Sequence, residues 1–310
     1  MVTSGASNQT GAAVGAHAFP AIGPAGVVAV RQLVAAAVLL PTVRPPLRTF
    51  SRAQWWPVLL LGVVFGAMNL GLYTAIDRVG LALAVTLEFL GPLAVALAGS
   101  RRLVDLACAV AAGLGVYVLV LPSGSTDFVG VGCGLLAAAC WAGYILLNRL
   151  AGQRLPGLQA TAAASGVSTL MFLPVAALVV LRGELTGAAL AYAVTAGLLS
   201  SIVPYALDLT ALRTVPTRFF GMFMSVHPVL GAISGLVILR QGLPWHEALG
   251  IAVVVTTNVV AVGTTRNRPA QSALATSSST SAWQGSASGH QHARSWPARS
   301  RRTSSTLTAR

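Results

Sequence analysis

The sequence predicts an all-α membrane protein, a polytopic bundle of ten helices of which the first is shortened. The composition is the first reason. Apolar residues make up 55% of the 310 residues and charged residues only 9%, whereas a soluble domain carries about 25% charged residues. So few charges cannot cover a surface in water, so lipid must surround most of the chain. The second reason is that apolar segments of about 20 residues, the length that crosses a bilayer, follow one another along the sequence.

Nine segments are long and apolar enough to be taken as spans. They are expected at residues 24–41, 56–76, 81–99, 103–121, 129–149, 158–181, 187–207, 217–239 and 245–264. Residues 3–19 are uncharged but short, and Asn8, Gln9 and His17 make them weakly apolar, so they predict part of a tenth helix. Residues 265–310 are rich in Ser, Thr, Ala and Arg and have no apolar periodicity, which predicts a disordered basic tail.

An internal repeat divides the spans into two halves. Ala75 and Ala211, Val79 and Val215, and Pro92 and Pro228 are each separated by 136 positions. We therefore expect one repeat over residues 1–122 and a second over 127–264. The sixth of the ten spans starts near residue 129, and a position 136 residues earlier would lie before residue 1. The first helix is thus expected to lack its opening turns, which a start site placed too far downstream or a truncated gene would explain. A membrane protein with two similar halves is most often a transporter.

The charges predict the topology. All 20 basic residues are arginine, and most loop arginines fall in alternate loops, which the positive-inside rule assigns to the cytoplasm. The arginine-rich loops hold Arg44, Arg48, Arg52, Arg101, Arg102, Arg149, Arg154, Arg213 and Arg218, against Arg78, Arg182 and Arg240 in the intervening loops. With ten spans, both termini are then cytoplasmic, in a cell (inner or plasma) membrane. The net charge of +13 is thus a topology signal that needs no nucleic acid partner.

The sequence offers no pattern for catalysis or for a cofactor. Cys108, Cys133 and Cys140 lie in or at the ends of spans without a CxxC pair or a histidine at ligand spacing, which fits small packing residues better than a metal site. No phosphate-binding loop, Ser-His-Asp set or Asp-rich magnesium motif is present. We therefore expect a protein that is not an enzyme and that uses no metal and no cofactor.

Two charged residues lie deep within spans, seven residues or more from either end, where ionisable groups are costly and usually functional. Glu88 is seven residues or more from either end of its span, and lipid disfavours its charged form, which suits a group that binds a proton or an ammonium. Alternatively, it is a structural carboxylate, held protonated or paired with Arg31. Arg31 could bind a substrate carboxylate with two hydrogen bonds, or neutralise Glu88 and hold two helices together. These alternatives remain open.

Further candidates are polar aromatic or helix-breaking residues. His227 could carry protons, although a hydrogen bond to a carbonyl freed by Pro228 is the favoured role. Trp141 and Tyr144 are three apart on one helix face and either line a cavity or pack. Pro92, Pro228 and Gly91 weaken helices and are the expected hinges.

Several of these residues also carry a family resemblance. The segment from Val79 to Arg102, with Glu-Phe-Leu-Gly-Pro at 88–92, resembles the fourth-helix region of EamA-domain transporters in the drug/metabolite transporter superfamily. Residues 19–31, 139–146 and 204–228 resemble other helices of this family, so the likeness covers about residues 3–264. The closest subgroup is the inner-membrane threonine/homoserine exporters, to which the runs at 88–96 and 216–221 point.

The resemblance implies ten helices as two inverted five-helix repeats, without nucleotide. It also implies secondary transport, most often efflux by proton antiport, through a site between the halves lined by helices that include the second, fourth, sixth and ninth. Glu88 and Arg31 fall on positions that match the family pattern. His227 replaces a glutamate, and Arg240-Gln241 replaces Gly-Glu, so proton coupling would depend on Glu88 or His227.

The sequence thus predicts a secondary transporter that exports small metabolites, amino acids such as threonine or homoserine first among them. An exporter of another solute, such as a drug or nucleobase-like metabolite, is one alternative, and a non-transporting membrane scaffold or sensor is another. The expected partners are a small-molecule substrate, protons and the lipid bilayer, with a homodimer left open.

Overall fold

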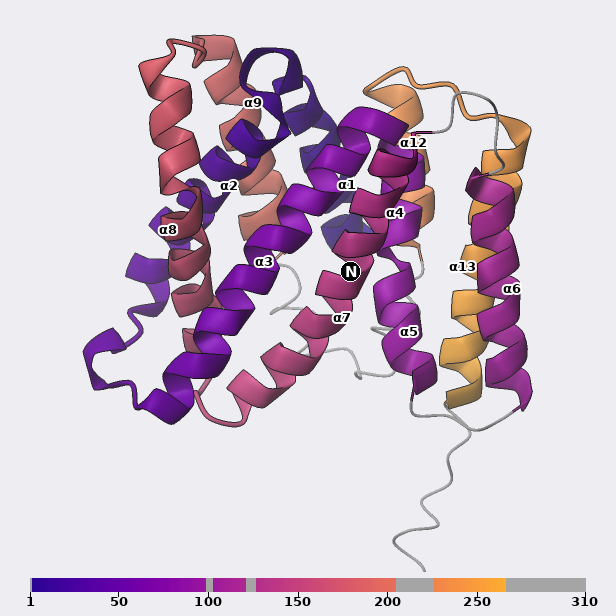
Figure 1. The fold of residues 1–310 in the computed structure, drawn as a ribbon, viewed down its shortest axis with the longest axis horizontal. Coiled ribbons are helices and arrows are strands. Elements are labelled where there is room, and N and C mark those ends of the chain that lie inside the picture. Colours follow the sequence, from indigo (N-terminus) through magenta and orange to yellow (C-terminus); the bar gives the residue numbers. More distant parts are fainter. Residues whose placement is uncertain (1, 99–102, 121–126, 205–225, 266–310) are drawn as a thin grey trace, which may run out of the picture. The chain divides into compact units, whose positions relative to one another are not determined.

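The regular elements of the described part of the chain are all helical (Figure 1). The computed structural model describes residues 2–98, 103–120, 127–204 and 226–265. Each of the ten predicted helices is represented there, at least in part, so the predicted fold class is confirmed. The α-helices are α1 Val2–Ala16, α2 Phe19–Val43, α3 Arg52–Val79, α4 Leu81–Glu88, α5 Leu90–Ala98, α6 Leu103–Val120, α7 Phe128–Gly152, α8 Gln159–Leu181, α9 Gly187–Gly197, α12 His227–Val237 and α13 Trp245–Thr265.

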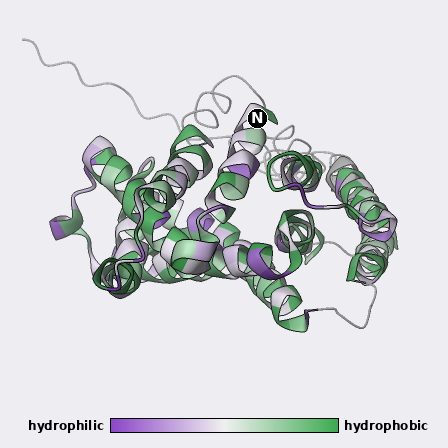
Figure 2. Cartoon of the chain, turned by 90° about the horizontal axis from the view of Figure 1, so that it is seen from above, coloured by the Kyte–Doolittle hydropathy of each residue, from purple (hydrophilic) through white to green (hydrophobic). Residues whose placement is uncertain are grey.

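The helices have the length and surface of membrane spans. By length and composition, α2, α3, α7 and α8 can each cross a bilayer, and shorter apolar stretches lie in α4–α5, α6, α9, α12 and α13. Large apolar side chains point outward on many of them, for example Leu103 at 83% and Leu170 at 68% exposure. Figure 2 shows hydrophobic residues dominating the helices, with hydrophilic ones confined to short stretches. Such a surface is stable in lipid rather than in water.

The first helix is short, as predicted. α1 has 15 residues, which makes it about 22 Å long, whereas the hydrocarbon core of a bilayer is about 30 Å thick. α2 follows directly and contains a kink at Gly23, whose φ of 66° is accessible mainly to glycine. The second helix therefore begins before residue 24, where the apolar run had placed its start.

The predicted fourth span is broken in two. α4 ends at Glu88 and α5 begins at Leu90, with Phe89 between them. Pro92 explains the break, because it has no N–H to donate to the carbonyl of Glu88 four residues earlier. Hydropathy over 81–99 does not mark this interruption, but the helix-weakening residues Gly91 and Pro92 lie just after it.

Helix packing relates the first five spans to the second five. α3 packs on α7 and α8, and its counterpart α9 packs on α1 and α2; α4 packs on α7, and its counterpart α12 packs on α1. The pairs α2–α8, α4–α12 and α6–α13 each join a span to its own counterpart. Exchanging the halves therefore preserves these contacts. On this basis we propose that the two repeats span residues 1–122 and 127–264.

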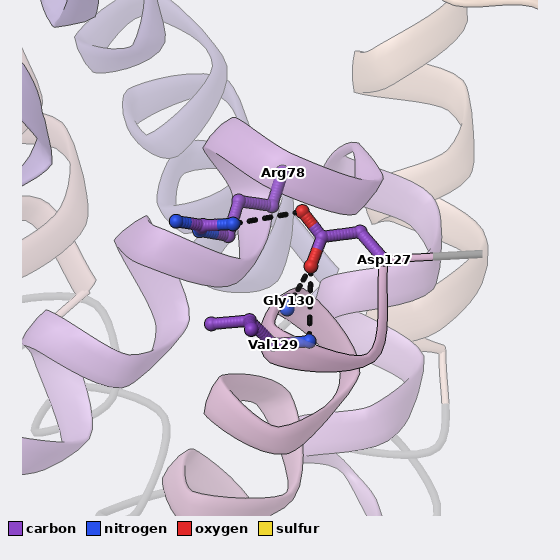
Figure 3. Close-up of polar contacts among 4 residues, drawn as sticks. All are labelled: Arg78, Asp127, Val129 and Gly130. Carbon is purple, nitrogen blue, oxygen red and sulfur yellow. Dashed lines mark hydrogen bonds and ion pairs between the residues drawn. The ribbon is translucent and has the colours of Figure 1, made fainter. Parts of the chain in front are cut away.

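Contacts near the loops show which parts of the chain lie together at each end of the bundle. At one end, Gln54 Nε2 donates a hydrogen bond to the carbonyl of Arg154 at 3.1 Å, and the Arg154 guanidinium lies 5.1 Å from the ring of Trp56. The arginine-rich loops α2–α3 and α7–α8 thus meet (Figure 1). At the other end, Arg78 in the last turn of α3 forms an ion pair of 2.9 Å with Asp127, which directly precedes α7 (Figure 3). The predicted tail and positions 205–225 lie outside the described residues.

Candidate functional site

Arg31 is held by the second half of the chain. It lies on α2 with 8% of its surface exposed. Its Nε donates to Ser201 Oγ at 3.4 Å and its Nη2 to the carbonyl of Ser200 at 3.3 Å. The guanidinium carbon also lies 5.3 Å from the centre of the Tyr73 ring, a cation–π distance. All of these partners are neutral, so they orient the charge of Arg31 without cancelling it.

Ser200 and Ser201 belong to a π-turn, η2, at Leu198–Ile202 at the end of α9. A π-turn widens the helical ring to i→i+5 hydrogen bonds, and such turns are frequent at functional sites. Two consecutive carbonyls of η2 accept bonds from other helices: Leu199 from Ser7 Oγ at 2.8 Å, and Ser200 from Arg31. The sequence does not identify these serines as candidate site residues, because a π-turn has no residue signature and serines are common in spans.

Glu88 is the second buried charge. It ends α4 and is 6% exposed. Within the described residues it forms no ion pair, although Arg31 is near enough for its charge to act on the Glu88 carboxylate. Cys140 on α7 also lies within electrostatic reach. The structure thus brings Arg31 and Glu88 into one interior region and leaves both charges without a direct ionic partner there.

Phe89 joins three elements around Glu88. Its ring lies 5.5 Å from Trp141 on α7, edge to face, and 6.1 Å from His227 on α12, stacked. The Nδ1 atom of His227 is buried and has no hydrogen-bond partner among the described residues. Phe89 had been missed because an aromatic residue in an apolar run carries no signal of its own. Its position beside the helix break at Pro92 is the clue that could have identified it.

Trp141 and Tyr144 contact different neighbours although they share a face of α7. Trp141 packs on Phe89, whereas the Tyr144 ring lies 6.1 Å from Phe65 on α3. Tyr144 also packs against the apolar cluster that contains Val58 and Leu61. Trp141 therefore packs on the residue that follows Glu88, whereas Tyr144 packs between α3 and α7.

The hinge candidates lie at helix junctions. Gly91 follows the break, and a Cβ atom added there would overlap the carbonyl oxygen of Ala138 on α7. α5 therefore contacts the α7 backbone directly. Pro228 lies in the first turn of α12, where the missing N–H removes no hydrogen bond.

A separate pocket of ≈ 360 Å³ lies at the end of the bundle that holds Arg78. Its wall includes Asp77, Glu247 and Gln241, and Gln241 Oε1 accepts a hydrogen bond from the backbone N–H of Leu81 at 3.0 Å. Gln241 thus caps the start of α4. In the described ranges no three His, Cys, Asp or Glu side chains are grouped as metal ligands.

Comparison with known proteins decides the family. The chain is 36% identical over 270 residues to the threonine/homoserine exporter RhtA of Escherichia coli strain K12, which covers 86% of this chain and 91% of that protein. The RhtA of Salmonella typhimurium strain SL1344 is also 36% identical, over 85% of this chain and 90% of its own. The profile of the EamA-like transporter family matches residues 128–262. The chain belongs to the EamA-like transporter family.

The fold also matches that of a solved structure. One crystal structure aligns with a TM-score of 0.51 at 21% identity, over 84% of this chain and 96% of that one. At that identity the likeness concerns the fold alone. Family membership, together with the apolar helices, makes this EamA-like protein a multi-pass membrane protein and confirms the resemblance seen in the sequence.

Proposed function

We propose that this protein exports small metabolites, with threonine and homoserine as its first substrates. The observation that carries the proposal is a pair of buried, opposite charges that are not joined to each other. Arg31 contacts only neutral acceptors, and Glu88 makes no ion pair in the described interior. Burying unpaired charges is costly, so a ligand that satisfies both would offset that cost. The relatives named threonine/homoserine exporters give the substrate class.

A free amino acid is such a ligand. Its carboxylate matches the guanidinium of Arg31, which can donate two hydrogen bonds, and its ammonium matches the carboxylate of Glu88. Phe89, which follows Glu88 in the chain, and Trp141, which packs on Phe89, would supply an apolar wall for a small side chain. The transporter performs no chemical step on the substrate in this proposal.

We also propose that transport is driven by proton antiport. Glu88 would bind either a proton or the substrate ammonium, so that the two ligands exclude each other at one carboxylate. His227, whose Nδ1 lacks a hydrogen-bond partner in the described structure, would pass protons to this site past Phe89. Alternating access would follow from motion of one repeat against the other, with the break between α4 and α5 as a hinge.

The proposed location is the inner or plasma membrane, with the arginine-rich end and the end of α13 in the cytoplasm. The contact between the α2–α3 and α7–α8 loops supports this placement, because it gathers the arginine-rich loops on one side.

Efflux from proteoliposomes tests the function. Liposomes loaded with labelled threonine should lose it faster with the protein than without, and an inward proton gradient should increase the rate. Glu88→Gln should abolish the dependence on the proton gradient, because the amide cannot exchange a proton. Glu184→Gln is the matched control, since Glu184 lies in a loop beside Arg182 at 3.8 Å and should leave transport unchanged.

Two results would contradict the proposal. Normal proton-linked efflux by the Glu88→Gln protein would exclude the role of Glu88. No efflux of any amino acid in a panel by the unaltered protein would favour another solute or a non-transporting role.

A further inference from the structure

The π-turn η2 has a polar connection on each side. On one side, Ser201 Oγ and the Ser200 carbonyl accept hydrogen bonds from Arg31 of α2. On the other, Ser200 Oγ donates to the carbonyl of Asn8 on α1 at 2.9 Å, and Ser7 Oγ donates to the carbonyl of Leu199 at 2.8 Å. Both serines of η2 are buried, at 7% and 4% exposure. Because water is excluded, these bonds fix the turn between α1 and α2.

Close packing reinforces this position. A Cβ atom added at Gly11 of α1 would overlap Ser200 Oγ, and one added at Gly197 would lie 2.9 Å from Val34 Cβ and 3.4 Å from the Cα of Arg31. The turn is therefore held against α1 and α2 by shape as well as by hydrogen bonds. A shift of η2 would move the acceptors of Arg31 with it.

The two bonds to Arg31 are long for N–H···O contacts, at 3.4 and 3.3 Å, compared with about 2.9 Å for a typical bond. Neutral acceptors at such distances direct a guanidinium but hold it less strongly than a carboxylate would. Among the described residues these are the hydrogen bonds of the guanidinium, and its other N–H groups could bond a planar anion. This is the arrangement of a cation that is oriented before its ligand arrives.

From this geometry we propose that Ser200 and Ser201 of the π-turn are positioning residues, which orient Arg31 to receive the carboxylate of an α-amino acid substrate. This rests on the proposed function and deepens it. The second half of the chain would thereby contribute to a carboxylate site whose cation comes from the first half. Substrates that lack a free carboxylate would not benefit from the turn.

Ser201→Ala is the direct test, with labelled threonine efflux and competition by threonine or by threonine methyl ester. Loss of the hydroxyl should raise the KM for threonine about three- to tenfold, the range expected for one hydrogen bond, with the maximal rate little changed. Inhibition by the methyl ester, which keeps the ammonium but has no carboxylate, should not change. Ser201→Thr, which restores a hydroxyl, should return the KM toward the original value.

Ser165→Ala is the matched control. Ser165 is as buried as Ser201, at 1% exposure, but its Oγ donates to the Thr161 carbonyl within α8 at 3.0 Å. This variant should change neither the KM for threonine nor the inhibition by its methyl ester. Gly11→Ala, which pushes the turn away from α1, should reproduce the selective loss of affinity for threonine.

The outcomes are distinguishable. Equal weakening of threonine and its methyl ester by Ser201→Ala, or no change in either, would overturn the role of the π-turn while leaving the exporter function standing. Absence of threonine transport by the unaltered protein would overturn the proposed function, and the positioning role with it.

Discussion

At the scale of single residues, two kinds of charged group differ. The buried charges of the interior have no ionic partner among the described residues, whereas charged groups at the end of the bundle are paired and hydrogen-bonded. Asp127 shows the second kind clearly. Its side chain accepts hydrogen bonds from the backbone N–H groups of Val129 and Gly130, both at 2.9 Å, and pairs with Arg78 (Figure 3). It therefore both caps α7 and ties it to the end of α3. Arg31, by contrast, has two long hydrogen bonds in the part of the chain that the structure describes.

The Asp127 contacts predict a pH-dependent contribution to stability. The Gly130 N–H, first, and then Arg78 lower the pKa of the Asp127 carboxyl below its ordinary value. A group with a lowered folded-state pKa stabilises the fold above its unfolded pKa of about 3.9, and this contribution is lost as the pH falls through the folded value.

Asp127→Asn should separate the two roles of this residue. Asparagine caps a helix as well as aspartate does, so only the charge pairing with Arg78 is lost. Thermal unfolding in detergent should show a lower midpoint than the original protein at pH 7, and a smaller difference near pH 3, because the charge pairing is lost as the pH falls toward the lowered pKa of Asp127. Asp127→Ala, which removes the cap as well, should unfold at a lower temperature at both pH values. Equal midpoints of all three proteins at pH 7 would contradict this assignment.

At the scale of elements, the broken fourth span is the feature that arranges the site. It places Glu88 at the end of one helix and Phe89 between two, and the Phe89 ring meets α7 and α12. α5 then contacts α7 without intervening side chains at Gly91.

Gly91→Ala should disturb this contact strongly. The added methyl would meet the carbonyl oxygen of Ala138, which is backbone and cannot rotate away. Overpacking of this kind costs about 1–3 kcal/mol, so thermal unfolding should occur at lower temperature and efflux should slow. Gly132→Ala is the control, because its Cβ would meet nothing within 4 Å and alanine favours helix. A Gly91→Ala protein as stable as the Gly132→Ala protein would show that α5 can move off α7.

The sequence predicted the spans well and the site contacts only in part. Runs such as 159–181 carry no charge and are mostly apolar, and hydropathy alone places them in lipid. Glu88 and Arg31 were recognisable because charges in spans are rare. Their partners were not, since the rotation of α2 against α9 depends on packing at Gly197 and on a π-turn that no residue pattern announces. Phe89 was missed for the same reason, because its contacts depend on a break that apolar periodicity does not reveal.

At the scale of the whole chain, corresponding helices of the two halves make corresponding contacts, and the loops divide between two opposite ends of the bundle. Both features support the proposed alternating access. Arginine-rich loops meet through Gln54 and Arg154, while Arg78 and Asp127 lie at the opposite end. This division predicts which loops face the cytoplasm.

Labelling of single cysteines should establish that topology. In a protein whose native cysteines are replaced by alanine, Gln153→Cys should react with a membrane-impermeant maleimide only after the cells are opened. Arg182→Cys should react in intact cells, because it lies in the loop between α8 and α9. The reverse pattern would invert the proposed orientation. A cysteine at a lipid-facing site such as Leu170 should react in neither case.

The ties at the two ends of α3 have a mechanical consequence. Arg154 and Gln54 join the start of α3 to the α7–α8 loop, and Arg78 and Asp127 join its other end to the start of α7. Two antiparallel rods fastened at both ends cannot slide along each other, but they can still roll about their common long axis. The pair would therefore behave as an axle, and opening toward either side of the membrane would require the surrounding helices to turn around it. Removing one of these two contacts would therefore alter the rate at which the protein opens from one side of the membrane to the other and leave its affinity for substrate unchanged.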